Sequence, residues 1–323
     1  MRQRSLAAGL LAAGLFASAA SFAQSYPSKP LRMLVGFPPG GANDIVARLV
    51  AQKLGDDLGQ PVVVENRPGN TGVIAAETVA RAPRDGYTLF LGSTGTNSIA
   101  PSLMPKFPFD PNNDLAAVTL VGVAPSCLAI NAGVPAQNVR ELVALAKSRP
   151  GRLTYASSGN GTTLHLGGEL FKLVAGVDLV HVPYKGNAQA LNDVIGGQVD
   201  MIISALPPAL PLAKAGKLRI LGVTTLERLA SAPELPTVAE QGLPGFEIGT
   251  WYGVFAPGGS PPEAIERLAQ SWRKSASDAK LREQFAAQGI DPASSTPAEF
   301  RAFVAAEIAK WARVIRAAGI KAD

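Results

Sequence analysis

"LRMLVGFPPGGANDIVARLVAQKLGDDLG", residues Leu31 to Gly59, joins an apolar run to an amphipathic segment through a glycine-rich elbow. The apolar run Leu31–Phe37 predicts a buried strand, and residues 43–59 predict a helix that ends at Gly59. On this helix we expect Ile45, Leu49 and Leu54 to share the buried face. The function of the elbow then depends on what surrounds it.

The same alternation of strand and helix recurs along most of the chain. Further strands are predicted at residues 61–66, 87–92, 152–158, 177–184, 198–204 and 218–225, and further helices at 73–82, 138–151, 162–176, 187–197 and 207–217. This pattern is typical of an α/β fold, in which helices cover a parallel sheet.

Two other apolar segments interrupt the alternation, one at residues 119–133, broken by Pro125, and one at 250–259. We expect them to cross between two lobes and to act as a hinge. The first lobe is predicted to comprise residues 26–125 plus 252–323, and the second residues 126–251.

The last part of the chain is predicted to be helical. Ser260 and Thr296 each precede proline and a glutamate three residues on, so both are predicted helix caps. The final helix carries Phe300, Trp311 and Ile315 on one face, and this stripe indicates core packing rather than a cofactor site.

The N-terminus has the pattern of a secretory signal. A basic "MRQR" precedes a short apolar stretch, and Ser21 and Ala23 occupy the positions that a signal peptidase recognises. We expect residues 1–23 to be a signal peptide, cleaved near Ala23, and the product to be periplasmic. A membrane anchor is the alternative, but the apolar run is short for a span.

Composition excludes several classes of function. Loss of Arg2 and Arg4 with the signal lowers the formal net charge from +5 to +3, and the basic residues form no stripe for nucleic acid. Cys127 is the single cysteine, and His165 and His181 are the two histidines, without metal-ligand spacing. We therefore expect no metal, no cofactor and no nucleic-acid partner.

Catalytic and nucleotide-binding motifs are also missing from the sequence. Gly36 and Gly41 have the spacing of a phosphate-binding P-loop, but Ala42 and Asn43 stand where lysine and serine or threonine are required. There is no G-x-S-x-G elbow, and we identify no nucleophile–base pair. The sequence therefore favours a protein that is not an enzyme.

Three further strand–helix loops share the chemistry of the elbow, which makes four in all. "GSTGTNS" (Gly92–Ser98), "SSGNGTT" (Ser157–Thr163) and "PYKGN" (Pro183–Asn187) are also rich in Gly, Ser, Thr or Asn. Helix starts leave backbone N–H groups unpaired and favour negative charge, and glycine allows close approach. One such loop alone is better explained by ordinary capping, but two in each lobe favour a site for an anion or polar ligand at a shared crevice.

Three side chains near these loops have two interpretations each. His165 lies in the first turn of its helix, where it either touches a ligand or packs and caps. Lys185 is the most plausible cation at the crevice, although a solvated loop lysine is the commoner outcome. Asp44 either recognises a ligand amine or hydroxyl, or stabilises its own helix N-terminus.

The chain resembles the extracytoplasmic solute receptors of tripartite tricarboxylate transporters, the Bug family. The resemblance rests on "YPSKPLRMLVGFPPGG", "VVVENRPG", "RAPRDGYTLFLG", "VPYKGNAQALNDVIGGQVDMI" and "WYGVFAPGGSPP", which follow in order over the mature chain. "NRPGNTG" (Asn66–Gly72) departs from the family, which more often has a smaller, glycine-richer stretch there.

The resemblance implies a two-lobed periplasmic binding protein, a Venus flytrap of type II-like form. It implies a small carboxylate ligand, such as a di- or tricarboxylate, an acidic amino acid or an aromatic acid, held by backbone amides and waters. It also implies two membrane subunits, one large and one small, as partners.

The family's site maps onto the four loops and one strand end. The implied ligand-binding residues are Phe37, Gly40, Gly41, Asn43 and Asp44; Ser93, Thr94, Thr96 and Asn97; Ser158, Gly159, Gly161, Thr162 and His165; Tyr184, Lys185, Gly186 and Asn187; and Ser204. Among these we expect Gly40, Gly41, Thr96, Ser158 and Gly161 to hold the primary carboxylate.

Two other functions stay open from the sequence. The same flytrap serves a sensor that signals to a membrane kinase, and transport and sensing share the same residues. An exported hydrolase or isomerase would need the nucleophile–base pair that the sequence does not show. Neither the identity of the carboxylate nor the oligomeric state follows from the sequence.

Overall fold

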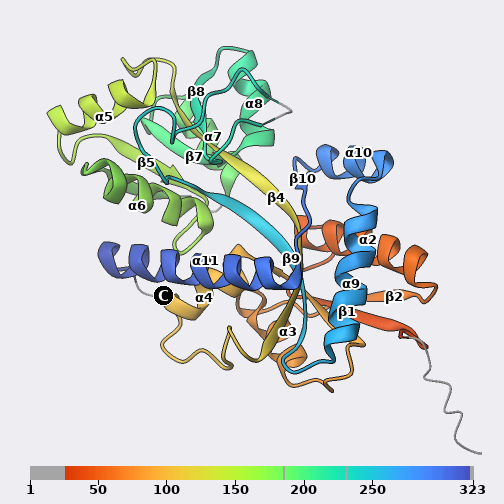
Figure 1. Cartoon of the computed structure of the whole chain (residues 1–323). Helices are drawn as coiled ribbons and strands as arrows, with labels where there is room; N and C mark the ends of the chain where they lie inside the picture. Colours follow the sequence, from red (N-terminus) through yellow and green to blue (C-terminus); the bar gives the residue numbers. More distant parts are fainter. Residues whose placement is uncertain (1–25, 185, 230–231, 321–323) are drawn as a thin grey trace, which may run out of the picture.

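The computed structural model describes residues 26–184, 186–229 and 232–320. The predicted signal peptide and its cleavage near Ala23 therefore lie outside the described residues. Figure 1 shows two α/β halves, linked by two long strands. The first half begins with the elements β1 (Leu31–Val35), α2 (Ala42–Leu58), β2 (Val62–Asn66), η1 (Asn70–Gly72), α3 (Val73–Ala80), β3 (Thr88–Ser93), η2 (Gly95–Ile99) and α4 (Ala100–Leu103).

The chain then crosses to the second half and returns. The crossing strand is β4 (Leu115–Asn131), and the second half contains α5 (Val139–Ser148), β5 (Thr154–Ser157), α6 (Thr163–Ala175), β6 (Val180–Pro183), α7 (Asn187–Ile195), β7 (Met201–Ala205), α8 (Leu206–Lys214) and β8 (Leu218–Val223). The return and the C-terminal part contain β9 (Gly249–Pro257), α9 (Pro262–Ser275), α10 (Ala279–Ala287), β10 (Asp291–Pro292) and α11 (Pro297–Ala318).

Among the described residues the strands form one continuous sheet in the order β2-β1-β3-β9-β4-β7-β5-β6, with β8 and β10 also paired to β4. β1 is parallel to β2 and β3, and β5 is parallel to β6 and β7. The loops that follow these strands therefore emerge at one edge in each half, as the alternation of strand and helix predicts.

The predicted break at Pro125 is wrong, because β4 runs through it. Pro125 pairs with Gly249 at the end of the β9 ladder, and the next residue, Ser126, begins the pairing with β7. A proline lacks the N–H that a continuous ladder needs, and here it falls where β4 changes partner. The long crossing strand is therefore continuous and joins the two halves directly.

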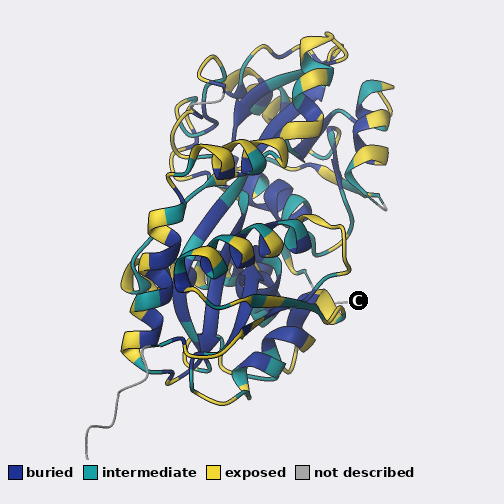
Figure 2. Ribbon diagram, turned by 90° about the vertical axis from the view of Figure 1, so that its right-hand side faces the viewer, coloured by how far each residue is buried: buried dark blue, intermediate teal, exposed yellow. Residues whose placement is uncertain are grey.

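The buried face of α2 is also turned from the predicted one. Ile45 and Leu49 are half-buried, whereas Val46, Val50 and Leu54 are buried against β1 and β3. Ala47 and Ala51 allow the helix to lie close to the sheet, so the helix turns toward its small residues. Figure 2 shows buried strands in both halves, with helices that expose their outer faces.

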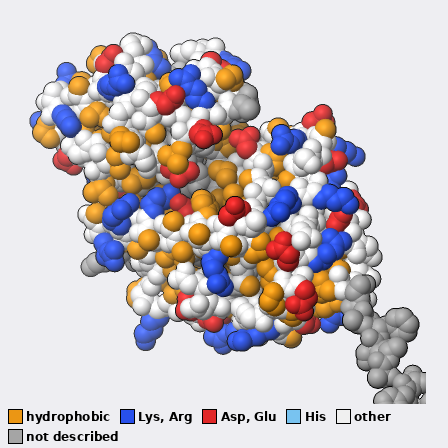
Figure 3. Space-filling model, in the orientation of Figure 1, with side chains coloured by type: hydrophobic (Ala, Val, Ile, Leu, Met, Phe, Trp, Pro, Cys, Tyr) orange, Lys and Arg blue, Asp and Glu red, His pale blue; other side chains and the backbone are white. Residues whose placement is uncertain are grey.

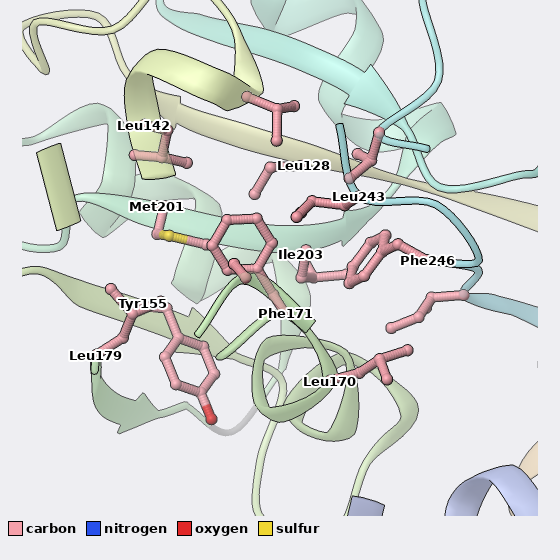
Figure 4. Close-up of a cluster of buried hydrophobic side chains, with 14 of the residues drawn as sticks. Leu128, Leu142, Tyr155, Leu170, Phe171, Leu179, Met201, Ile203, Leu243 and Phe246 are labelled. Atoms are coloured by element: carbon pink, nitrogen blue, oxygen red, sulfur yellow. The ribbon is translucent and has the colours of Figure 1, made fainter. Parts of the chain in front are cut away.

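The final helix belongs to both halves. Phe300 and Val304 pack with Phe90 and Phe255 in the first half, whereas Trp311 and Ile315 join the core of the second half. Figure 4 shows part of this second core, in which Phe171, Met201 and Phe246 lie together. In Figure 1 α11 crosses beneath α6, and it also contacts η2 and α4. The predicted stripe is thus core packing, shared between the halves.

Candidate functional site

The loops that follow β1 and β3 meet at one point of the first half. A Cβ on Gly72 would lie 2.6 Å from Oγ1 of Thr96 and 3.2 Å from the ring of Phe37. Gly36 also lies close to Gly72, since a Cβ added to Gly36 would lie 2.3 Å from the Cα of Gly72. Such close approach requires glycine at both positions.

Asp44 fixes the first loop. Its carboxylate, 3% exposed, accepts hydrogen bonds from the N–H of Gly40 at 2.9 Å, from Arg48 at 3.0 Å and from Asn66 at 2.8 Å. Burial alone would raise the pKa of Asp44, but these donors lower it to about 2. Asn66 also donates to the carbonyl oxygen of Phe37 at 3.0 Å. Asp44 thus stabilises its own loop and helix start, one of the two interpretations that the sequence left open.

The other predicted site residues of this loop differ in their exposure. Gly40 and Gly41 are exposed, and Gly40 has a φ of +83°. Phe37 and Asn43 are half-buried, and Oδ1 of Asn43 is buried without a hydrogen-bond partner among the described residues. The first intrahelical bond of α2 runs from Ile45 to Gly41, so the N–H groups just before Ile45 have no partner within the helix.

The second loop is buried and is held by hydrogen bonds to β9 and to η1. Thr94 donates to the carbonyl of Gly249 and accepts from the N–H of Trp251, which ties the loop to β9. Thr96 donates to the carbonyl of Thr71 at 2.7 Å. Four predicted site residues are at most 3% exposed here: Ser93, Thr94, Thr96 and Asn97. Their side chains therefore hold the loop in place in this structure.

The third loop caps α6 with its own side chains. Thr162 accepts from the N–H of His165, and Ser158 donates to Oγ1 of Thr162 at 3.2 Å. The N–H of Gly161 donates to Nδ1 of His165 at 3.0 Å, which gives this imidazole the tautomer protonated on Nε2. His165 is 6% exposed, so it packs and caps in this structure.

A stack of aromatic rings supports the third loop from below. The rings of His165 and His181 are 4.0 Å apart, and that of Tyr155 is 4.8 Å from His181. The hydroxyl of Tyr155 points away from the core in Figure 4 and donates to Glu169 at 2.5 Å. Burial, and to a lesser extent the charge of His165, lowers the pKa of His181 to about 4. Burial also lowers the pKa of His165, so both rings are neutral near pH 7.

The structure contains a serine–histidine pair that sequence reasoning missed. Oγ of Ser157 is 2.7 Å from Nε2 of His181. Ser157 is fully buried and also bonds the backbone of Gly159, so its hydroxyl is closed to a substrate. Among the described residues no carboxylate bonds the His181 ring, and a catalytic base would need that orienting group. The pair therefore stabilises the loop.

The fourth loop lies beside the third. A Cβ on Gly159 would lie 3.3 Å from the carbonyl oxygen of Tyr184. The hydroxyl of Tyr184 donates to Asp193 at 2.8 Å, and Asn187 exchanges hydrogen bonds with Ser204 at 3.0 and 3.2 Å. Gly186 has open space around its Cα, and Lys185 lies outside the described residues.

The two halves approach each other through the third loop. A Cβ on Gly161 would lie 3.3 Å from the side chain of Leu103, which follows η2 in the first half. Ile99 and Leu103 pack with the core of the second half. The structure thus brings loops one and two together, brings loops three and four together, and joins the halves beside loop three.

Figure 3 shows a recess between the halves, with hydrophobic side chains visible in it. A cavity of about 200 Å³ lies where α8 meets α10 and β10, lined by Pro125, Leu206, Pro207, Leu210, Ala232, Ala286, Gly289, Ile290 and Asp291. This lining is mostly apolar and offers few donors to an anion. The polar loops are therefore the better candidate site.

Several residues at the site escaped the sequence reasoning. Arg48 and Asn66 hold Asp44, and Glu169 holds Tyr155. The i, i+4 spacing of Asp44 and Arg48 was a usable signal. Asn66 ends a predicted strand, but only the tertiary structure brings its amide to the carbonyl oxygen of Phe37.

Two α/β halves joined by crossing strands, with polar loops at the strand ends of both, define a two-lobed binding protein of the periplasmic type. The chain belongs to the tripartite tricarboxylate transporter family receptors, whose family model matches residues 46–320. It is 40% identical over 300 residues to the protein BugT of Bordetella pertussis, and the match covers 93% of this chain and 92% of BugT.

Solved structures have the same fold. The Rhodopseudomonas palustris protein Rpa4515 with adipate is 36% identical and has a TM-score of 0.73, with 92% of this chain and 99% of that chain covered. A TctC solute-binding protein from Polaromonas without ligand is 27% identical, yet its TM-score is 0.83, with 90% and 99% covered. The present arrangement is therefore more similar to the ligand-free structure than to the adipate complex.

The family consists of periplasmic solute receptors rather than enzymes. Among the described residues no helix is long and apolar enough to cross a bilayer. The same residues contain no cluster of His, Cys, Asp or Glu side chains that is suited to a metal ion.

Proposed function

We propose that this chain captures a small organic carboxylate in the periplasm and delivers it to the membrane subunits of a tripartite transporter. The observation that supports the proposal is the pairing of polar loops at the strand ends of each half of a family receptor fold. Adipate in the related R. palustris protein supports a carboxylate as the ligand. The same proposal includes export, with cleavage near Ala23. It also includes the two lobes, residues 26–125 plus 252–323 and residues 126–251.

The ligand carboxylate is proposed to bind at the first turns of α2 and α6. Asp44 and His165 already accept from the N–H groups of Gly40 and Gly161. The first N–H groups of α2 and α6 have no backbone acceptor within their helices, and of these the N–H of His165 donates to the Thr162 hydroxyl. The ligand carboxylate therefore has two ways to bind. It either displaces Asp44 and His165 as the acceptors of these two N–H groups, or it accepts hydrogen bonds from the neighbouring N–H groups.

Closure of the halves is proposed to follow binding. The higher TM-score with the ligand-free Polaromonas structure, despite its lower identity, supports an open arrangement here. A ligand that contacts both halves stabilises the closed form by its differential affinity for it. The closed form would present both halves together to the membrane subunits.

Isothermal titration calorimetry tests the proposal. Adipate, malate, benzoate and glutamate would be titrated into the mature chain, together with adipamide as an uncharged analogue. We expect at least one carboxylate to bind with a dissociation constant in the micromolar range or below, and adipamide not to bind. If no carboxylate in a broader thermal-shift panel stabilises the chain, the proposed function is wrong.

A paired substitution locates the site. Ser158 is half-buried in the third loop, and Ser158→Ala should weaken binding about ten- to hundredfold, as expected for loss of one hydrogen bond to a charged group. Ser148→Ala is the matched control, because Ser148 is exposed and bonds its own helix. Equal affinities for both variants and the unaltered chain would exclude the third loop.

Uptake in a deletion strain separates transport from sensing. Loss of uptake of the bound carboxylate supports delivery to a permease. Normal uptake, with loss of a transcriptional response to the same acid, would replace transport by the sensor function.

A further inference from the structure

The turn that follows β2 lies at the same edge as the first two loops. β2 is parallel to β1, with Asn66 in register with Val35. The chain that leaves β2 therefore emerges beside the elbow that leaves β1. This turn, Gly69–Gly72, lies within the stretch Asn66–Gly72, whose sequence departs from the family pattern.

The turn is built into the first-half site. Thr96 of the second loop donates its hydroxyl to the carbonyl oxygen of Thr71 at 2.7 Å. Gly72 packs against the ring of Phe37 in the first loop, where a Cβ would lie 3.2 Å away. A Cβ on Gly95 would lie 3.5 Å from the methyl group of Thr71. The turn thus fills the space between loops one and two.

Two consecutive non-glycine residues have left-handed backbone here. Asn70 has a φ of +48° and Thr71 a φ of +54°. Asparagine tolerates this region, but a β-branched threonine is a marked outlier. Such strain persists only where surrounding contacts enforce it, and it clusters at functional sites. The hydrogen bond from Thr96 is one contact that holds Thr71 in place.

Both side chains are exposed at this edge. The amide of Asn70 reaches only the thioether of Met104, a weak acceptor, at 3.7 Å. The Thr71 hydroxyl has no hydrogen-bond partner among the described residues. A strained turn therefore presents a carboxamide and a hydroxyl, both uncharged, beside the loops that are proposed to hold the carboxylate.

We propose that Asn70 and Thr71 are specificity-determining residues that recognise a hydroxyl or carbonyl group carried by the ligand. This inference rests on the proposed function, because it assumes a carboxylate at the loops. Neutral donors and acceptors suit a hydroxy or oxo acid, and a site that hydrogen-bonds such a group discriminates against the analogue that lacks it. The ligand class is thus narrowed to hydroxy- or oxo-carboxylic acids.

Matched ligand pairs and two substitutions test this inference. Malate against succinate, and citrate against tricarballylate, differ by one hydroxyl. Thr71→Val keeps the side-chain shape and the β-branch and removes the hydroxyl, and Asn70→Gly removes the carboxamide while it keeps the left-handed backbone. Thr78→Val on α3 is the control, because that hydroxyl bonds its own helix.

In the unaltered chain the hydroxylated acid of a pair should bind at least tenfold more tightly than its analogue. The two variants together should reduce this preference to less than threefold, with the affinity for the plain acid changed less than threefold. The Thr78→Val variant should keep the full preference. Melting temperatures within 2 °C of the unaltered chain's would confirm that the variants are folded.

The two ways in which the inference can fail differ in calorimetry. Carboxylate binding without a preference for the hydroxylated acid, or with a preference that both variants retain, overturns the role of Asn70 and Thr71 and leaves the proposed function intact. Absence of any carboxylate binding overturns both.

Discussion

Replacement of Asp44 by asparagine should destabilise the first half by an amount that depends on pH. Asp44 is 3% exposed, and its pKa is about 2 instead of 3.8. A difference of this size corresponds to about 2 kcal/mol of stability at neutral pH. Arg48 is half-exposed, so solvent screens its share, and an asparagine oxygen still accepts from Gly40. We therefore expect Asp44→Asn to cost about 1–2 kcal/mol.

The cost converts to a measurable shift in melting temperature. A chain of this length has an unfolding entropy of about 0.6 kcal/mol/K, so the variant should melt about 2–3 °C lower at pH 7. Because the folded-state pKa is lowered, the carboxylate contributes its stability above about pH 4 and loses it as the pH falls toward 2. The difference between the two proteins should therefore shrink steadily below pH 4.

Differential scanning calorimetry at pH 7, 5, 4 and 3 would follow this difference. Asp56→Asn is the control, since Asp56 lies exposed on the same helix and should shift the melting temperature by less than 1 °C. An Asp44→Asn variant that melts with the unaltered chain at pH 7 would refute the network. A difference in melting temperature that stays constant down to pH 3 would refute the electrostatic origin of the stabilisation by Asp44.

Three further substitutions test the packing and the titration. Tyr155→Phe should cost about 1–3 kcal/mol in urea unfolding, because it removes the 2.5 Å hydrogen bond to buried Glu169. Gly253→Ala places a Cβ 2.0 Å from the ring of Phe300 and should cost about 1–3 kcal/mol, partly relieved by Phe300→Leu. Burial and the adjacent histidine lower the pKa of His181 to about 4, so the unfolded chain binds more protons between pH 6.5 and 4. Thermal melts should therefore show the free energy of unfolding decreasing as the pH falls from 6.5 to 4, by at most about 1.4 kcal/mol per pH unit. The His181→Gln variant should show a smaller pH dependence of stability in that window.

The sequence predicted the fold well where the signal lies within a single helix or strand. The strand–helix alternation gave the two α/β halves, and Thr296 forms the predicted capping box with Glu299. The predicted cap at Ser260 is wrong, because α9 begins at Pro262 and the Ser260 hydroxyl donates to Pro257. A second proline at the helix start displaced the cap, and serine alone does not reveal this.

The hydrogen-bond partners at the site could not be predicted in the same way. Loops at the ends of parallel strands are visible in sequence, and the structure brings them together in each half. Which acceptor takes each N–H depends on side-chain placement across a loop, as in the bond from Gly161 to His165. Thr71 shows the same limit, because nothing in its sequence neighbourhood requires a left-handed threonine.

The electrostatics at the start of α2 indicate why donors from both halves would be needed to hold an acid. Asp44 is a resident anion at the start of α2, and Arg48 already pairs with it, so a ligand carboxylate brings uncompensated charge. A helix N-terminus contributes about 0.3–1 kcal/mol toward an anion, whereas micromolar affinity requires about 8 kcal/mol. Hydrogen bonds to a charged group contribute about 1.5–3 kcal/mol each, and ordering the loops opposes them. About three to five such donors are then necessary before the cost of ordering is counted, whereas one helix start leaves only about four N–H groups unpaired. In the proposed closure, donors from α2 and α6 reach the same carboxylate, so affinity and closure would be coupled.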